Sequence, residues 1–124
     1  MSDRALVIEI LTQLVDATST ILKRFEPVDS PEYFTSSDAG MEKLDAICMQ
    51  LIVIGEGLKN LDKVTEYSLL TEYTQVDWKK AKAIRDVISH HYFDVNAESI
   101  YIVCRKHIRP LHETLKQIIA DLKS

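Results

Sequence analysis

The sequence predicts an all-α fold, an up-and-down bundle of four to five helices that forms a single domain over residues 1–124. Apolar residues recur at helical spacing through most of the chain. Only 3 Gly and 3 Pro are present, which is too few turn-forming residues for a fold with many short strands. With hydrophobic residues at 46%, the chain can fill a core. We therefore expect helices joined by short connections.

The first predicted helix runs from Asp3 to Phe25. It is followed by Pro27 and Pro31, which lack an amide donor and clash with a preceding turn, so we expect a loop through Ser37. Ser37 or Asp38 is suited to cap the next helix. The apolar stripe of the first helix consists of Leu6, Val7, Ile10, Leu11, Leu14, Val15, Ile21 and Leu22.

The second predicted helix runs from Ala39 to about Val64, and it contains Gly55 and Gly57. Glycine costs up to about 1 kcal/mol relative to alanine inside a helix. Close approach of another backbone is a reason to tolerate that cost. The apolar stripe of this helix consists of Met41, Leu44, Ile47, Cys48, Leu51, Ile54, Leu58 and Leu61.

The second half of the chain predicts an irregular segment and two more helices. Thr65 to Val76 is polar, with one short turn around Leu69 and Leu70. Asp77 is a good N-cap for a helix from Trp78 to about His91. The last helix starts after Asn96 and runs to Leu122. Pro110 lies inside it and should kink or split it near His107 to Arg109.

Composition limits the classes of function. A net charge of −4 argues against a protein that coats nucleic acid nonspecifically, since that binding needs excess Lys and Arg, although a local basic patch stays compatible. No stretch approaches the roughly 18 to 20 apolar residues of a membrane span, and the N-terminus does not look like a signal peptide. Cys48 and Cys104 lie in apolar helical patterns, which favours reduced, buried thiols and a cytoplasmic location. We expect no metal site, because no close pairing of ligands appears.

The predicted third helix carries residues suited to phosphate chemistry. Arg85 offers a planar, permanently charged fork that matches phosphate oxygens. His90 titrates near neutral pH, and its place at a helix C-terminus, four residues after Asp86, favours the imidazolium form. Ser89 and Tyr92 supply hydroxyl groups. On an ideal helix, Arg85 and His90 are about 140° apart, so they converge only if the helix frays or a second subunit completes the site.

A basic stretch, Lys79, Lys80 and Lys82, precedes these residues. It is a candidate RNA-binding element on an acidic protein. A solvated helix face explains the same residues equally simply, and a histidine near an aspartate at a helix end is often a cap or a surface ion pair. Arg105, Lys106 and Arg109 form a second basic cluster with the same two interpretations.

The run from Arg85 through His90 to Tyr92 resembles the Arg-x4-His-x-Tyr signature of the HepT-like family within the HEPN superfamily. Ile54-Gly55-Glu56 resembles the Ile-Gly-Glu of the family's second helix. Val76-Asp77-Trp78-Lys79-Lys80 is similar to its Trp-containing entry to the motif helix, and Ile108-Arg109-Pro110-Leu111 to its Pro-Leu break. The resemblance covers roughly Leu44 to Ile119. Asp86 departs from it, because the residue after the arginine is commonly Asn.

This resemblance implies a homodimeric, metal-independent endoribonuclease without a cofactor, acting as the toxin of a type VII-like toxin–antitoxin pair. Arg85 and His90 would be the catalytic pair at a cleft between subunits, with Asp86 and Ser89 supporting them. The implied antitoxin is a minimal nucleotidyltransferase (MntA-type) that transfers AMP to the motif tyrosine, here Tyr92. The alternative is a non-catalytic helical partner of a nucleotidyltransferase, a substrate- or nucleotide-binding module, which Asp86 keeps open.

Overall fold

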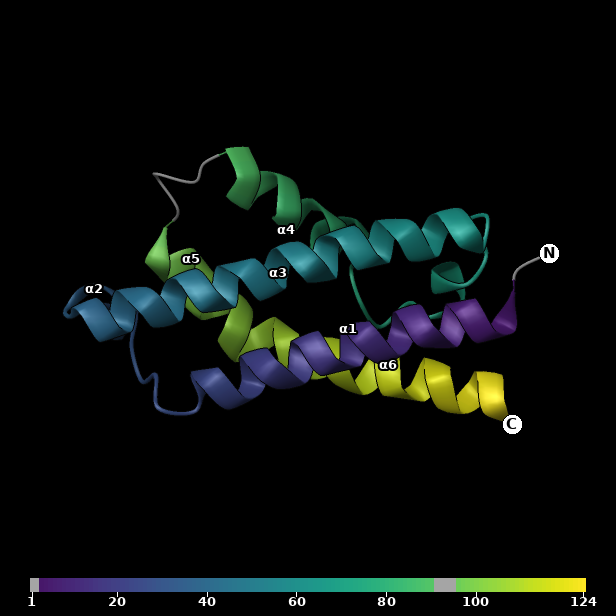
Figure 1. Cartoon of the computed structure of the whole chain (residues 1–124), viewed down its shortest axis with the longest axis horizontal. Helices are drawn as coiled ribbons and strands as arrows, with labels where there is room; N and C mark the ends of the chain where they lie inside the picture. Colours follow the sequence, from purple (N-terminus) through teal and green to yellow (C-terminus); the bar gives the residue numbers. More distant parts are fainter. Residues whose placement is uncertain (1–2, 91–95) are drawn as a thin grey trace.

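Three long helices lie side by side in the computed structural model of the chain, and a fourth lies along the outer flank of the three (Figure 1). The structure describes residues 3–90 and 96–124, without the side chain of His90. Within those ranges the secondary structure is entirely helical, which confirms the all-α prediction. The elements in chain order are α1 (Arg4–Phe25), α2 (Glu32–Thr35), α3 (Asp38–Val64), η1 (Leu70–Glu72), α4 (Trp78–His90), α5 (Ala97–Ile102), the π-helical segment η3 (Val103–His107) and α6 (Ile108–Lys123).

The core lies between α1, α3 and the α5–α6 region, and α4 covers the side of α3 that faces away from α1 (Figure 1). Consecutive long helices run in opposite directions, as an up-and-down bundle requires. Only Ile88 of α4 is fully buried among its described side chains, while Trp78, Ala81 and Ile84 are partly buried against the core. The candidate site therefore lies on a helix attached to the core by one narrow apolar face.

The caps predicted at Ser37 and Asp77 are confirmed, and the structure adds caps at Asp3 and Asn96. Asp3 accepts hydrogen bonds from the amides of α1, and the Ser37 hydroxyl accepts one from Gly40 N at 3.0 Å. The Asp77 carboxylate accepts one from Lys80 N at 3.1 Å at the start of α4, and Asn96 caps α5 in the same way. Each cap satisfies an amide that the helix itself leaves without an acceptor.

Two predicted details are wrong. The segment through Ser37 is not entirely a loop, because it contains the short helix α2, whose Phe34 is fully buried. The chain also contains a stretch apolar and long enough to cross a membrane, namely α1, whose mean hydropathy reaches 1.5. The buried core helices of soluble proteins reach the same length and hydropathy. Leu11 and Ile21 of α1 have no exposed surface and pack within the bundle, which accounts for the apolar content.

The last helix is split as predicted, but Pro110 is not at the break. The irregular turn is η3, in which the amide of Ile108 donates to the carbonyl of Val103 five residues earlier. A new helix begins at Ile108, so Pro110 falls in its first turn, where a missing amide costs little. Cys104 is buried in η3, and burial raises the pKa of its thiol to about 12. Burial also raises the pKa of Cys48 to about 11.

Gly55 sets the distance between α3 and α4. A Cβ atom at Gly55 would lie 2.5 Å from Cβ of Arg85 and 3.2 Å from the carbonyl oxygen of Lys82, so no larger residue fits without moving α4. The expected close approach of another backbone is therefore confirmed at this glycine. At Gly57 the neighbour is instead the end of the Leu14 side chain.

We predict that Gly55→Ala lowers the free energy of unfolding by about 1–2 kcal/mol. Overpacking costs about 1–3 kcal/mol, and the gain in helix propensity offsets up to about 1 kcal/mol of it. Gly57→Ala is the matched control and should cost less, because the Leu14 side chain can shift. Urea unfolding followed by circular dichroism measures both. Equal stability of Gly55→Ala and the native protein would contradict the assigned role of Gly55.

Candidate functional site

Three ion pairs join α3 to α4 in register. Going along α3, Glu56 pairs with Arg85, Lys59 with Asp86, and Asp62 with Lys82. Each carboxylate meets a cation on the facing helix, so the charges of this interface are compensated locally. Because these contacts lie on the same pair of helices as Gly55, they fix how α4 is rotated and hence where its functional side chains lie.

Arg85 is held by two carboxylates. Its Nε is in ion-pair contact with Oε1 of Glu56, and its Nη1 donates to Oδ1 of Asp86 at 3.0 Å. The hydrogen bond to Asp86 and the charge of Glu56 raise the pKa of Arg85 above its already high usual value. Its side chain keeps 36% of its exposure. Arg85 is thus a permanently charged, oriented group at the protein surface.

Asp86 bridges the two helices rather than standing alone. Oδ2 accepts a hydrogen bond from Lys59 Nζ at 3.1 Å, while Oδ1 accepts from Arg85. Both cations stabilise the carboxylate, with Lys59 acting most strongly, and they lower the pKa of Asp86. Asp86 therefore stays ionised at all physiological pH values. Its carboxylate brings a full negative charge next to Arg85.

The three lysines of the predicted RNA-binding stretch separate in space. Lys82 donates to Asp62, whose side chain is 6% exposed, so this lysine neutralises a buried charge. Lys79 is exposed and has no carboxylate partner within the described residues. Lys80 lies elsewhere, beside a more apolar cavity of about 540 Å³ between α4 and the α5–α6 region. These positions show that the basic stretch does not form one continuous face.

Ser89, His90 and Tyr92 are the remaining predicted site residues. Ser89 is exposed on α4, and His90 is the last residue of that helix. The His90 side chain and all of Tyr92 lie outside the described residues. Since α4 is helical through His90, the backbone positions of Arg85 and His90 keep the angular separation expected of a regular helix.

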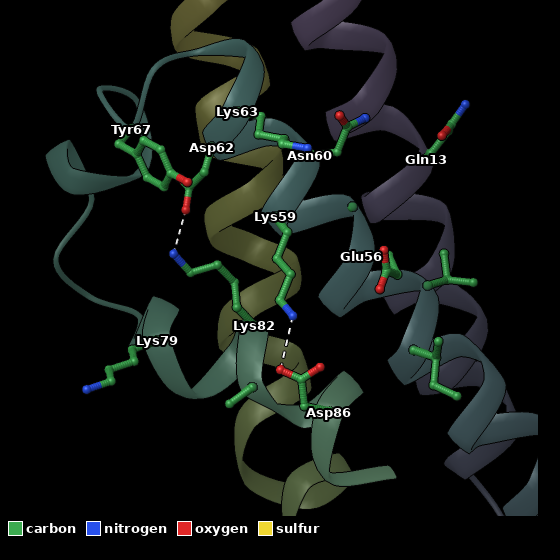
Figure 2. A pocket seen from close by; sticks show the side chains of 14 residues that line it. Gln13, Glu56, Lys59, Asn60, Asp62, Lys63, Tyr67, Lys79, Lys82 and Asp86 are labelled. Atoms are coloured by element: carbon green, nitrogen blue, oxygen red, sulfur yellow. Dashed lines mark hydrogen bonds and ion pairs between the residues drawn. The ribbon is translucent and has the colours of Figure 1, made fainter. Parts of the chain in front are cut away.

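A groove of about 990 Å³ lies beside the α3–α4 ion pairs (Figure 2). Its charged lining comprises four lysines and three carboxylates, which makes it locally more positive than the chain as a whole. Within the described ranges, no group of three metal-ligating side chains is placed to hold an ion. The groove is lined by Gln13, Ile52, Val53, Glu56, Gly57, Lys59, Asn60, Asp62, Lys63, Tyr67, Lys79, Lys82, Ala83 and Asp86.

Several of these residues were not identified from the sequence. Lys59 and Asp62 are the α3 partners of the motif helix, and Glu56 was considered equally a packing residue. A signal was present, because the face of α3 that carries Glu56 turns polar after Gly55 and repeats at helical spacing through Lys59, Asn60 and Lys63. What the pattern did not show is which side of α4 this face would meet.

Comparison with known proteins gives a family model described as Ribonuclease HepT-like, which matches residues 8–118. A relative from Methanocaldococcus jannaschii named "Putative RNase" is 38% identical over 79 residues, 63% of this chain and 61% of the relative. A second protein with that name, from Caldanaerobacter subterraneus subsp. tengcongensis, is 34% identical over 78 residues, 63% of this chain and 66% of the relative. The aligned region thus spans less than two thirds of either relative's length. No solved structure gives a significant match.

The contrast between Lys82 and Lys79 predicts different effects on stability. Lys82→Ala should lower the free energy of unfolding by about 3 kcal/mol, because it leaves the buried Asp62 carboxylate without its cation. Lys79→Ala, the matched control on the same helix, should change it by no more than about 0.5 kcal/mol. Urea unfolding at pH 7 measures both. If Asp62→Asn does not relieve part of the Lys82→Ala loss, the buried charge is not its cause.

Proposed function

The chain belongs to the HepT-like ribonuclease family, and from this premise we propose that it is a metal-independent endoribonuclease acting as the toxin of a toxin–antitoxin pair. The observation that carries the proposal is Arg85, a surface guanidinium oriented by two carboxylates and located within the segment that the family model matches. RNA phosphates are the natural ligand of such a group. The relatives named as ribonucleases support the same chemistry.

The proposed reaction uses the nucleophile that RNA already contains. The 2′-oxygen attacks the adjacent phosphorus, and His90 or a second histidine takes the 2′-hydroxyl proton. The bond between phosphorus and the 5′-oxygen breaks, and that oxygen receives a proton from the acid partner. Arg85 neutralises the charge that develops on the phosphorane oxygens. The products are a 2′,3′-cyclic phosphate and a 5′-hydroxyl, and no metal-bound water is needed.

Arg85 can serve this role while held by its carboxylates. Glu56 and Asp86 contact Nε and Nη1, and Nη2 has no carboxylate partner among the described residues. One edge of the fork is therefore available to a phosphate. The two carboxylates fix the guanidinium in place, but their charges also oppose an approaching phosphate, which tunes the site toward substrates that bring additional contacts.

A homodimer fits the geometry of α4. Arg85 and His90 are separated by about 140° around a regular helix, so one helix does not direct both side chains at the same phosphate. A second subunit that presents its own α4 would bring the arginine of one chain toward the histidine of the other. In this arrangement the two His90 residues would act as base and acid.

We propose that an antitoxin regulates the ribonuclease by modifying Tyr92. A nucleotidyltransferase that transfers AMP to the Tyr92 hydroxyl would form a phosphodiester bond there and release pyrophosphate from ATP. The added phosphate carries a negative charge close in sequence to Arg85, where it would compete with RNA for the guanidinium.

We predict that the purified protein cleaves single-stranded RNA in the presence of a chelator, leaving cyclic phosphate ends. Arg85→Ala and His90→Ala should each lower the rate by about 100-fold or more, the scale expected for a positioned cation or acid–base group. Lys116→Ala, an exposed lysine on α6, is the control and should cleave normally. Gel electrophoresis and mass spectrometry of the ends provide the readout.

Two outcomes would contradict this mechanism. The first is cleavage at a nucleotide whose 2′-oxygen is methylated, because that oxygen could no longer attack. The second is full activity of His90→Ala. If the protein forms a stable complex with a nucleotidyltransferase but never cuts RNA, it is a non-catalytic binding module, a function that the carboxylate-bound state of Arg85 also permits.

The proposed regulation has its own test. Protein coexpressed with a nucleotidyltransferase encoded beside it should gain the mass of one AMP on the peptide that contains Tyr92, and Tyr92→Phe should abolish the gain. Tyr67→Phe serves as the control tyrosine and should leave the modification intact. AMP found on another peptide would overturn the assignment to Tyr92.

A further inference from the structure

Tyr67 is an exposed aromatic side chain at the edge of the groove. The residue is 63% exposed, the largest fraction among the exposed large hydrophobic and aromatic residues that the structure describes. It comes from the loop after α3, and Figure 2 shows it on the same side of the pocket as Asp62 and Lys79. Because its ring is not packed in the core, core stability does not explain its position.

The backbone that presents Tyr67 is strained. The end of α3 has the hydrogen bonds of a Schellman motif, with Tyr67 N donating to Asp62 O at 2.8 Å and Glu66 N donating to Lys63 O at 3.3 Å. Glu66 has a φ of 53° and Tyr67 a φ of 63°, the left-handed region that glycine favours. Two consecutive residues with side chains in this region are costly, and such strain is concentrated at functional sites.

The charges around Tyr67 leave two lysines available. Of the four lysines lining the groove, Lys59 and Lys82 are paired with Asp86 and Asp62. Lys63 and Lys79 are exposed and have no ion-pair partner among the described residues. All three groove carboxylates are already engaged by cations of the α3–α4 interface. The free positive charge of the groove is therefore concentrated at the end where Tyr67 lies.

We propose that this end of the groove is a binding subsite for single-stranded RNA, in which Tyr67 stacks on one base and Lys63 and Lys79 bind the flanking phosphates. An exposed aromatic ring and lysines in one groove are the combination with which proteins hold single strands without reading their sequence. The groove volume of about 990 Å³ is large enough for a nucleotide. The identity of the ligand as RNA rests on the proposed ribonuclease function.

This subsite would continue toward the reacting phosphate. Asp86 lines the groove, and it is hydrogen bonded to Arg85 at 3.0 Å. A strand lying in the groove would thus pass from Tyr67 along α4 to the guanidinium. Contacts at Tyr67 would supply binding energy that offsets the repulsion of a phosphate by Glu56 and Asp86.

The test measures binding separately from cleavage. Fluorescence anisotropy is recorded with short labelled oligomers of adenosine and of uridine whose sugars are 2′-O-methylated, so that the proposed reaction cannot occur. Tyr67→Ala should weaken binding of the adenosine oligomer roughly 10-fold, the scale of one base–aromatic stack. It should also reduce the preference for adenine over uracil. Tyr67→Phe keeps a ring and should bind like the native protein.

The lysines are tested through the salt dependence of binding. Lys63→Ala and Lys79→Ala should each reduce the slope of log affinity against log salt by about 0.7, as expected when one phosphate contact to a single strand is lost. Lys116→Ala on α6 is the matched control and should leave the slope unchanged. An oligomer with an abasic site in place of the stacked base should bind equally to Tyr67→Ala and to the native protein.

A pair of glycine variants separates strain from binding. Glu66→Gly and Tyr67→Gly should both raise the melting temperature, because each relieves a left-handed backbone. Only Tyr67→Gly should lose affinity for the adenosine oligomer.

The subsite is refuted if the native protein does not bind these oligomers, if Tyr67→Phe loses as much affinity as Tyr67→Ala, or if equal loss occurs with the abasic oligomer. Binding that depends on Tyr67 in a protein that cuts no RNA would refute the proposed ribonuclease and leave the subsite intact. Normal cleavage without any dependence of binding on Tyr67 would do the reverse.

Discussion

The close approach of α3 and α4 at Gly55 is the constraint on which the candidate site depends. A missing side chain on one helix lets the Cβ of Arg85 rest against the backbone of the other. Ion pairs can then form along the same contact, with Glu56, Lys59 and Asp62 meeting cations and a carboxylate of α4. Since α4 buries only one described side chain completely, this contact rather than the core determines the position of Arg85.

The electrostatic arrangement explains how an acidic protein can carry a phosphate site. Lysines that face buried or bridging carboxylates have their charge neutralised by an ion pair, as Lys82 does with Asp62. Among the groove lysines, Lys63 and Lys79 have no such partner among the described residues and are available to an anion. Counting basic residues in the sequence therefore overestimates the binding surface, because Lys79, Lys80 and Lys82 have three different environments. The same logic points to Lys63, which no basic cluster in the sequence indicates.

The sequence predicted the helices well, because helix limits depend on local chemistry. Prolines, caps and apolar spacing placed α1, α3 and α4 to within one or two residues, and Gly55 correctly indicated a close helix contact. The short helix α2 was missed because its burial, complete at Phe34, depends on packing against α3 and α5. The partners of Arg85 and Asp86 depend on the relative rotation of two helices, and the conformation of Tyr67 depends on how α3 ends. Hydrophobic periodicity predicts neither the relative rotation of two helices nor the conformation of the backbone at the end of a helix.

The π-helical segment η3 has a consequence for the history of the chain. A helix that makes one hydrogen bond to the fifth preceding residue holds one residue more than an α-helix of the same length needs. Ile100, Cys104 and Ile108 nevertheless all remain on the buried side. This is what a single inserted codon would leave behind if selection preserved the core on both sides of it. In relatives that lack this one residue, the last helix would then be a continuous α-helix with the same buried residues and without the distorted turn.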